Sequence, residues 1–238
     1  MRHLEATSRP AEKICEIEGR LRRCYGRPRL ENPADPLEDL VFIVLSRMTQ
    51  EVKYTRTYRS LRLRFPSWEA VCDAPDDDLE EVLHDAGLAA TKGRQIQSIL
   101  REIKKREGDL SLCRLHSLDD EAVERYLTSL PGVGTKTARC VMLYTLNRDQ
   151  CPVDTHVWRV ARRLGIGPDR AWSDGQGREL GDAIPKEIRG SVHVTFIAHG
   201  REICTARRPR CGQCILDDLC PRRGVIDPAR HSAWGLGT

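Results

Sequence analysis

Hydrophobic and polar residues follow one another along this chain with the spacing of amphipathic helices. Pro and Gly interrupt the pattern every 10 to 20 residues, and no sustained apolar–polar alternation typical of strands is present. The apolar run 40–45 fits either a buried strand or a buried helix, and its helical neighbours favour a helix. The pattern therefore predicts an all-α fold, whose longer helices cover 52–64, 89–106, 118–129 and 135–147.

Short polar residues predict where several helices begin. Ser67 and Asp76 stand in N-cap positions, and Ser117 with Asp120 three residues later resembles a capping box for the helix 118–129. Asp154 precedes another helix, which Gly165 ends.

Composition narrows the class of protein. The chain has 238 residues, of which 39% are hydrophobic and 31% charged, as in a folded globular protein of one large or two modest domains. No apolar run approaches the roughly 20 residues that a membrane span needs, and residues 1–10 lack the apolar core of a secretion signal. We therefore expect a cytoplasmic protein, with no membrane partner and with reduced thiols.

The net charge of +4 is weak as a global number. Residues 1–119 are neutral overall, however, so the whole surplus lies in residues 120–238. Arg accounts for 32 of the 39 basic residues, which suits phosphate contacts but also follows from a GC-rich genome. The charge indicates where to look for an anionic partner and does not identify one.

Four of the ten cysteines cluster near the C-terminus with the spacing C-x6-C-x2-C-x5-C. Four thiolates within 17 residues can surround one metal centre, and the candidate ligands are Cys204, Cys211, Cys214 and Cys220. Four separate buried or unpaired thiols are the structural alternative. Zinc is one candidate, but zinc sites usually use two short C-x2-4-C pairs and this segment has one. The longer gaps let the loop enclose a larger body and favour a [4Fe-4S] cluster.

Residues 130–138, Leu-Pro-Gly-Val-Gly-Thr-Lys-Thr-Ala, lie between two predicted helices. Gly132 and Gly134, separated by Val133, allow a tight hairpin whose backbone N–H groups can contact a DNA phosphate without reading sequence. An ordinary turn between helices would have the same pattern.

Lys136 and Asp154 are the candidate chemical groups. Lys136 falls in the first turn of a helix, where the helix dipole disfavours a cation, so a partly desolvated amine is expected to be available as a nucleophile. Asp154, 18 residues later in Val-Asp-Thr-His, could cap its helix and also stabilise a cationic sugar transition state or move protons. A solvated lysine and a simple N-cap are the structural alternatives.

With the hairpin, its Lys, the Val-Asp-Thr-His segment and the cysteine loop in this order, the chain resembles the endonuclease III family of helix-hairpin-helix DNA glycosylases. The resemblance also covers Leu45-Ser46, Gly87-Leu88 and His199-Gly200-Arg201. It implies two helical domains that flank a DNA-binding cleft: a six-helix barrel over 38–148, and an iron–sulfur domain from 1–37 plus 149–238.

The resemblance implies a monomer that binds damaged double-stranded DNA in the cytoplasm, or at the nucleoid if the source is bacterial. Lys136 would attack the sugar of a flipped oxidised pyrimidine nucleotide, release the base and nick the strand by β-elimination through a Schiff base. Asp154 matches the family's catalytic Asp, and the [4Fe-4S] cluster would hold the loop with Arg207, Arg208 and Arg210 against phosphates.

Two positions depart from the family pattern. Met48 stands where the family usually has a Gln that fills the gap left by the flipped nucleotide, and Glu51 replaces a lesion-facing Asp. Met could fill the gap as an apolar wedge. These departures keep two alternatives open: a damaged-DNA binder with little catalysis, and a glycosylase of mismatched or alkylated bases.

Overall fold

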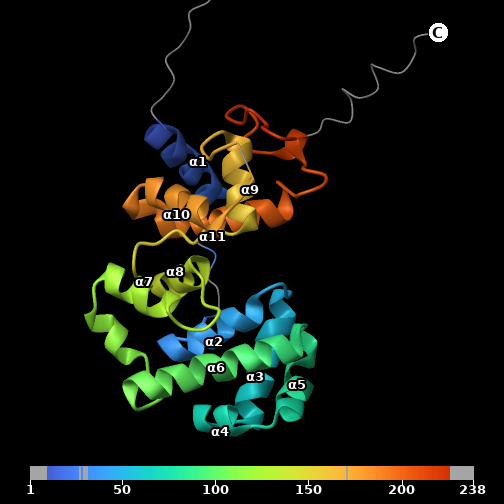
Figure 1. Ribbon diagram of the computed structural model, residues 1–238. Helices are drawn as coiled ribbons and strands as arrows, with labels where there is room; N and C mark the ends of the chain where they lie inside the picture. Colours follow the sequence, from blue (N-terminus) through green and yellow to red (C-terminus); the bar gives the residue numbers. More distant parts are fainter. Residues whose placement is uncertain (1–9, 27, 29–31, 170, 226–238) are drawn as a thin grey trace, which may run out of the picture. The chain divides into compact units, whose positions relative to one another are not determined.

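A computed structural model describes residues 10–26, 28, 32–169 and 171–225. Within these residues every regular element is a helix, which confirms the all-α prediction. The elements group into two compact units, one formed by Met1–Arg29 with Val153–Thr238 and the other by Leu30–Pro152 (Figure 1). None of the described helices is both long enough and apolar enough to span a bilayer.

The unit Leu30–Pro152 contains most of the predicted helices. Its elements are α2 (Pro36–Ser46), α3 (Glu51–Arg64), α4 (Trp68–Asp73), α5 (Asp76–Leu83), the 3-10 helix η1 (His84–Ala86), α6 (Ala89–Glu107), the 3-10 helix η2 (Cys113–Ser117), α7 (Asp120–Thr128) and α8 (Thr135–Tyr144). Helix α6 packs on α4 and α5, and α7 packs on α8. The hairpin therefore lies between two helices of one compact unit.

Helix α2 explains the unbroken apolar run. Its N-cap Asp35 accepts hydrogen bonds from the backbone N–H groups of Leu37 and Glu38 at 2.9 and 3.0 Å. The helix contacts α3, α6 and α8, so residues 40–45 are buried on every side. A helix surrounded by others has no polar face, and this removes the usual helical periodicity.

Two of the predicted N-caps are wrong by one or two residues. Helix α5 begins at Asp76 with Pro75 as its N-cap, so Asp76 instead places a negative charge in the first turn. Helix α7 is capped by Asp119, whose carboxylate accepts from the N–H of Ala122, while the Ser117 hydroxyl donates to Arg114 in η2. Ser67 caps α4 as predicted.

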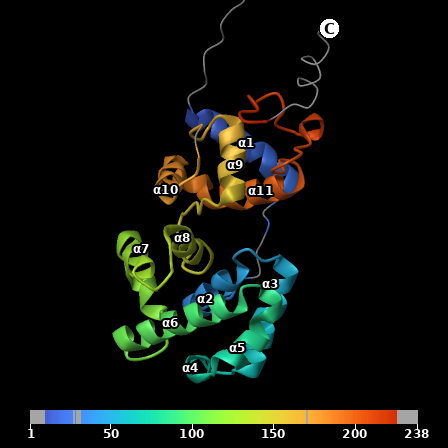
Figure 2. The ribbon, with the colours of Figure 1, turned by 45° about the vertical axis from the view of Figure 1, so that its right-hand side comes forward.

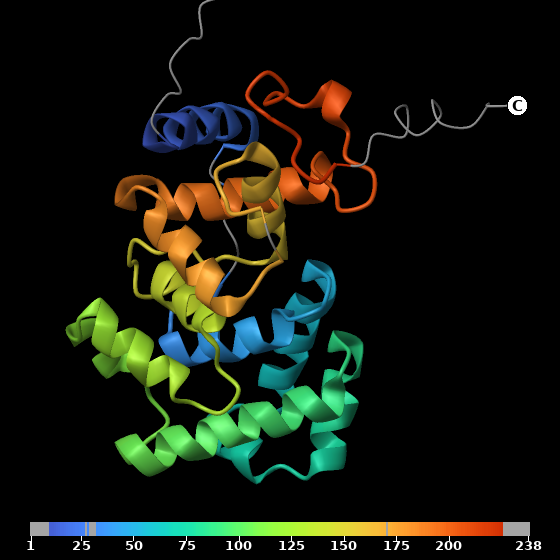
Figure 3. The same ribbon diagram turned by 45° about the horizontal axis from the view of Figure 1, so that its top comes forward.

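The second unit is built around α11. Its elements are α1 (Pro10–Tyr25), α9 (Thr155–Leu164), α10 (Asp174–Ala183), the 3-10 helix η3 (Lys186–Ile188), α11 (Arg189–Glu202) and the 3-10 helix η4 (Cys211–Gln213). Helix α11 packs against both α1 and α9 (Figure 2). After α11 the chain forms an irregular loop, drawn in red in Figure 3. This loop carries the four clustered cysteines.

The domain boundaries inferred from the resemblance, 38–148 and 1–37 plus 149–238, stay predictions. Compactness alone does not show that either part folds independently, which is what defines a domain.

Candidate functional site

The hairpin at residues 130–134 is a close turn held by its neighbours. Gly132 has φ +68°, and a Cβ there would lie 2.7 Å from Nε2 of Gln95, which donates to the Gly132 carbonyl at 2.9 Å. The N–H of Val133 donates to Leu130 at 3.1 Å, and its side chain is buried. The Val133 N–H is thus engaged within the hairpin, and contact of Gly132, Val133 and Gly134 with a phosphate stays a prediction.

Lys136 lies in the first turn of α8, half-buried, as the sequence predicts. The structure adds a group that sequence reasoning missed, the fully buried Asp39 of α2, whose carboxylate accepts from Asn32 and Thr145, each at 2.6 Å. Burial raises the pKa of Asp39 to about 6, although these hydrogen bonds and the charge of Lys136 oppose the shift. The candidate nucleophile thus acts electrostatically on a buried carboxyl in its own unit.

Asp154 caps α9, which confirms its predicted structural role. One carboxylate oxygen, Oδ1, accepts from the N–H groups of His156 and Val157, both at 2.8 Å. The side chain of Asp154 is half-buried. His156 is held by Arg159, with 3.0 Å between Nδ1 and Nη2, and burial lowers its pKa. The catalytic role of Asp154 stays a prediction.

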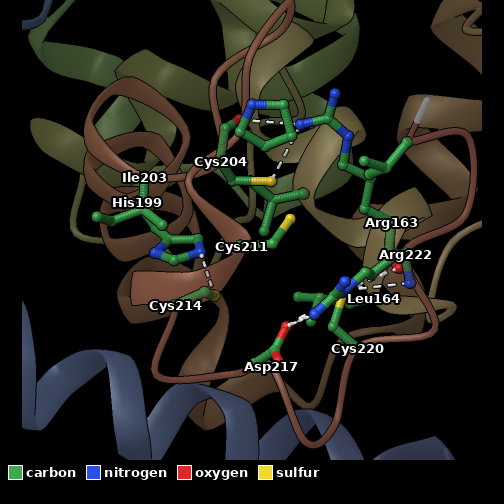
Figure 4. A pocket seen from close by; sticks show the side chains of 13 residues that line it. Arg163, Leu164, His199, Ile203, Cys204, Cys211, Cys214, Asp217, Cys220 and Arg222 are labelled. Atoms are coloured by element: carbon green, nitrogen blue, oxygen red, sulfur yellow. Dashed lines mark hydrogen bonds and ion pairs between the residues drawn. The ribbon is translucent and has the colours of Figure 1, made fainter. Parts of the chain in front are cut away.

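The four clustered cysteines line one cavity that is open to solvent (Figure 4). Helices α9 and α11 supply Arg163 and His199 to the same cavity. Among the described residues no three Cys, His, Asp or Glu side chains converge closely enough to hold one metal ion. The thiols are arranged around a space instead, and this arrangement fits a larger group that fills the space.

Hydrogen-bond donors already point at three of the four sulfurs. Arg163 Nη1 lies 3.3 Å from Cys204 Sγ, and the N–H groups of Leu216 and Arg222 donate to Cys214 and Cys220, each at 3.4 Å. His199 Nε2 lies 3.5 Å from Cys214 Sγ. Such donors stabilise thiolate ligands and orient them toward a cluster. The residues present therefore fit a four-cysteine iron–sulfur centre.

Arg163 also fixes the cysteine loop to α9, a role that the sequence did not reveal. The guanidinium is buried and donates to the carbonyls of Thr205 at 2.7 Å and Ala206 at 2.9 Å. Tyr25 of α1 lies 3.1 Å from His199 Nδ1, on the opposite ring edge from Cys214. Helices α1, α9 and α11 thus all hold the cavity wall.

The predicted DNA contacts all lie at exposed or turn positions. Met48 is 94% exposed with φ +55°, and Glu51 is exposed in the first turn of α3. Arg207, Arg208 and Arg210 are exposed on the cysteine loop. Contact with DNA through these residues stays a prediction.

Lys92, a buried cation of α6, was also missed by sequence reasoning. A signal was present, because Lys92 shares a helical face with Ile96 and Ile99, four and seven residues later, and both are fully buried. A lone lysine on an apolar face indicates a specific set of acceptors within the fold.

Comparisons with known proteins agree with this geometry. A family model described as HhH-GPD superfamily base excision DNA repair protein matches residues 41–180. A second, described as the iron-sulfur binding domain of endonuclease III, matches residues 204–220. Endonuclease III of Escherichia coli (strain K12) is 31% identical over 220 residues, which cover 90% of this chain and 98% of that protein. The endonuclease III of Treponema pallidum is 31% identical, covering 78% and 83%.

Two solved structures have the same fold. A non-covalent endonuclease III–DNA complex has a TM-score of 0.76 at 27% identity, and a trapped endonuclease III–DNA covalent intermediate has 0.75 at 26%. Each covers 91% of this chain and 97% of the compared chain. The match at 204–220 begins and ends at Cys204 and Cys220, so the cofactor of the loop is a [4Fe-4S] cluster. The chain belongs to the endonuclease III family of DNA glycosylases and AP lyases, within the helix-hairpin-helix base excision repair superfamily.

Proposed function

We propose that this protein is a bifunctional DNA glycosylase and AP lyase that excises oxidised pyrimidines from damaged double-stranded DNA, acting as a monomer. The observation that carries the proposal is the placement of Lys136, half-buried in the first turn of α8 directly after the hairpin. A hairpin that would hold the DNA backbone next to an amine suits attack on a sugar, because sugars and phosphates alternate along that backbone. Family membership supports the reaction class.

In the proposed reaction the neutral amine of Lys136 attacks C1′ of the flipped nucleotide. The C1′–N bond breaks, and the base leaves with the bonding electrons and takes up a proton. The sugar ring opens as the C1′–N bond to lysine becomes a protonated imine. Loss of a proton from C2′ then breaks the C3′–O bond, which nicks the strand on the 3′ side, and water hydrolyses the imine to regenerate Lys136.

Asp154 is proposed to stabilise the cationic sugar or to accept protons during this sequence. Its capping bonds engage Oδ1, and a carboxylate has a second oxygen for such a role. The [4Fe-4S] cluster is proposed to be structural, holding Arg207, Arg208 and Arg210 in place for phosphate contact. The backbone of Gly132 and Gly134 would bind a further phosphate.

Borohydride trapping on DNA with an abasic site tests the central step, because reduction of the imine links enzyme and DNA covalently. Lys136→Ala should abolish trapping, while Lys105→Ala, which removes an exposed lysine of α6, should leave it unchanged. Lys136→Gln and Asp154→Asn should retain DNA binding. Trapping that survives Lys136→Ala would remove Lys136 from its assigned role.

Met48 supports a second candidate in the same reaction class. Its side chain is almost fully exposed at the position where the family usually has Gln, and it has no hydrogen-bond donor and only a weak sulfur acceptor to offer an opposite base. A shift toward mismatched or alkylated bases would follow. Base release from thymine glycol, dihydrouracil and mismatch duplexes separates the two, and DNA binding without release on every duplex would identify a non-catalytic damage binder.

A further inference from the structure

Lys92 is a buried cation whose every proton has a partner. The side chain is 4% exposed, and Nζ lies 2.8 Å from each of three oxygens, the carbonyls of Leu45 and Ala86 and the hydroxyl of Thr49. An ammonium has three protons, so each oxygen receives one. Burial, with the nearby charge of Arg47, lowers the pKa of Lys92 to about 8, so the ammonium form still dominates at neutral pH.

The three oxygens come from two separate turns of the unit Leu30–Pro152. Leu45 and Thr49 flank the turn between α2 and α3, and Ala86 ends η1 just before Gly87-Leu88. The Thr49 hydroxyl also bonds to the Ala86 carbonyl, which ties the two turns directly. Since the Leu45 and Ala86 carbonyls lie at helix ends, an apolar residue at position 92 would leave both without this donor.

Each of the two turns presents an apolar side chain on a left-handed residue. Met48 has φ +55° and is 94% exposed, and Leu88 has φ +53° and is 59% exposed. The left-handed conformation costs a residue with a side chain about 1–2 kcal/mol. Exposed apolar groups in such a conformation persist when the surrounding structure holds them, and they concentrate at functional sites.

A second polar residue of α6 extends the same connection to the hairpin. Gln95 accepts from Arg47 Nη1 at 2.9 Å and donates to the Gly132 carbonyl at 2.9 Å. Lys92 and Gln95 are three residues apart, so they lie on neighbouring turns of one helix face. One face of α6 therefore links the Met48 turn, the Leu88 turn and the hairpin.

We propose that Lys92 is a positioning residue that fixes the Met48 and Leu88 turns at one spacing, so that both apolar side chains enter the DNA duplex together when a nucleotide is extruded. The inference rests on the proposed function, because the wedge acts only if this protein flips a nucleotide. Apolar wedges that separate base steps need a fixed geometry, since unstacking costs a few kcal/mol per step. Directional hydrogen bonds from one ammonium supply that geometry, whereas apolar packing alone would leave the turns able to shift.

The test is a mutant cycle that reads nucleotide extrusion by the fluorescence of 2-aminopurine placed beside a lesion, together with single-turnover base release. Lys92→Met should lower both signals about tenfold, and Met48→Ala combined with Leu88→Ala should do the same. Adding Lys92→Met to that double variant should change either signal less than about twofold, because the side chains it positions are gone. Lys105→Met, an exposed lysine of the same helix, is the matched control and should behave as wild type.

Lys92→Arg keeps the charge and several donors, and we expect it to recover most of the extrusion signal. Thr49→Val removes one acceptor of Lys92 and also the direct bond from the Thr49 hydroxyl to the Ala86 carbonyl, and it should reduce extrusion about threefold. This variant replaces Lys92→Met in the mutant cycle if Lys92→Met fails to fold. Two results would overturn the positioning role. One is a triple variant whose loss of signal equals the product of the losses in Lys92→Met and in the Met48→Ala, Leu88→Ala variant. The other is an unchanged extrusion signal in folded Lys92→Met or Thr49→Val. If wild type neither extrudes a nucleotide nor releases a base on any duplex, the proposed function is wrong. This result differs from failure of the positioning role, in which wild type is active and the variants do not behave as expected.

Discussion

The unit Leu30–Pro152 and the cysteine loop of the other unit are stabilised in different ways. In Leu30–Pro152 one apolar cluster extends from Leu37 to Leu146, so burial of apolar surface holds the helices together. In the other unit, residues 204–225 contain one short 3-10 helix, and only Leu216 in this stretch is buried. Apolar burial cannot fix such a loop, and we propose that ligation of the cluster by the four cysteines supplies the missing constraint. Burial of apolar residues therefore fixes the unit Leu30–Pro152, whereas coordination of the cluster is proposed to fix the cysteine loop.

Loss of a cluster ligand should give the largest effect and should be confined to one unit. Cys214→Ala should remove the broad violet absorbance of the [4Fe-4S] cluster and expose backbone amides of 204–225 to fast hydrogen exchange. Amides of α2 and α6 should remain protected. Cys15→Ala, which removes an exposed thiol of the same unit, is the control and should change neither. Fast exchange throughout α2 and α6 would show that the two units depend on one cofactor.

A cavity in the other unit should give the reverse pattern. Leu100 is fully buried in the apolar cluster, and Leu100→Ala should lower the free energy of unfolding by about 2–5 kcal/mol. Denaturant unfolding followed by circular dichroism measures this change. The absorbance of the [4Fe-4S] cluster in the folded variant should match that of wild type. Loss of this absorbance at denaturant concentrations below the unfolding transition would show that the cysteine loop depends on the apolar cluster.

The buried carboxyl of Asp39 predicts that the stability of the unit Leu30–Pro152 depends on pH. The pKa of Asp39 is about 6 in the folded protein against 3.8 in the unfolded chain, so the folded state binds the extra proton between these values. The stability that this group contributes is fully present below about pH 4 and is lost as pH rises through 6, by about 3 kcal/mol at 1.36 kcal/mol per pKa unit.

Asp39→Asn should remove this contribution to the pH dependence. Urea unfolding of wild type and variant at a series of pH values between 4 and 7 compares the two slopes, with the difference between them assigned to Asp39. Equal slopes would mean that the carboxyl keeps its ordinary pKa despite its burial.

The smallest effect on stability is expected at Asp154, the cap of α9. Asn caps helices about as well as Asp, so Asp154→Asn should change the free energy of unfolding by less than about 0.5 kcal/mol, whereas Asp154→Ala should cost about 1 kcal/mol. If the carboxylate also takes part in catalysis, Asp154→Asn should slow base release by about 100-fold or more. Release at the wild-type rate would leave Asp154 as a cap alone.

Much of the fold could be predicted from local pattern. The helices, the turn glycines and the cap Asp154 are set by interactions within a few residues, which sequence spacing reports directly. The predictions of Asp76 and Ser117 as caps are wrong because their close neighbours Pro75 and Asp119 occupy the cap positions instead. A choice between adjacent candidates depends on where tertiary packing starts the helix.

By itself the sequence determined the all-α fold, the cysteine spacing that marks the [4Fe-4S] loop, and the hairpin with Lys136. Only the tertiary structure decided which polar groups are buried and what they contact. Asp39 meets Thr145, Lys92 meets Ala86 and Leu45, and Arg163 meets the cysteine loop, across gaps in sequence that no local pattern spans. The physical reason is that burial makes a charged or polar group depend on partners brought together by folding, whereas helix formation depends on near neighbours.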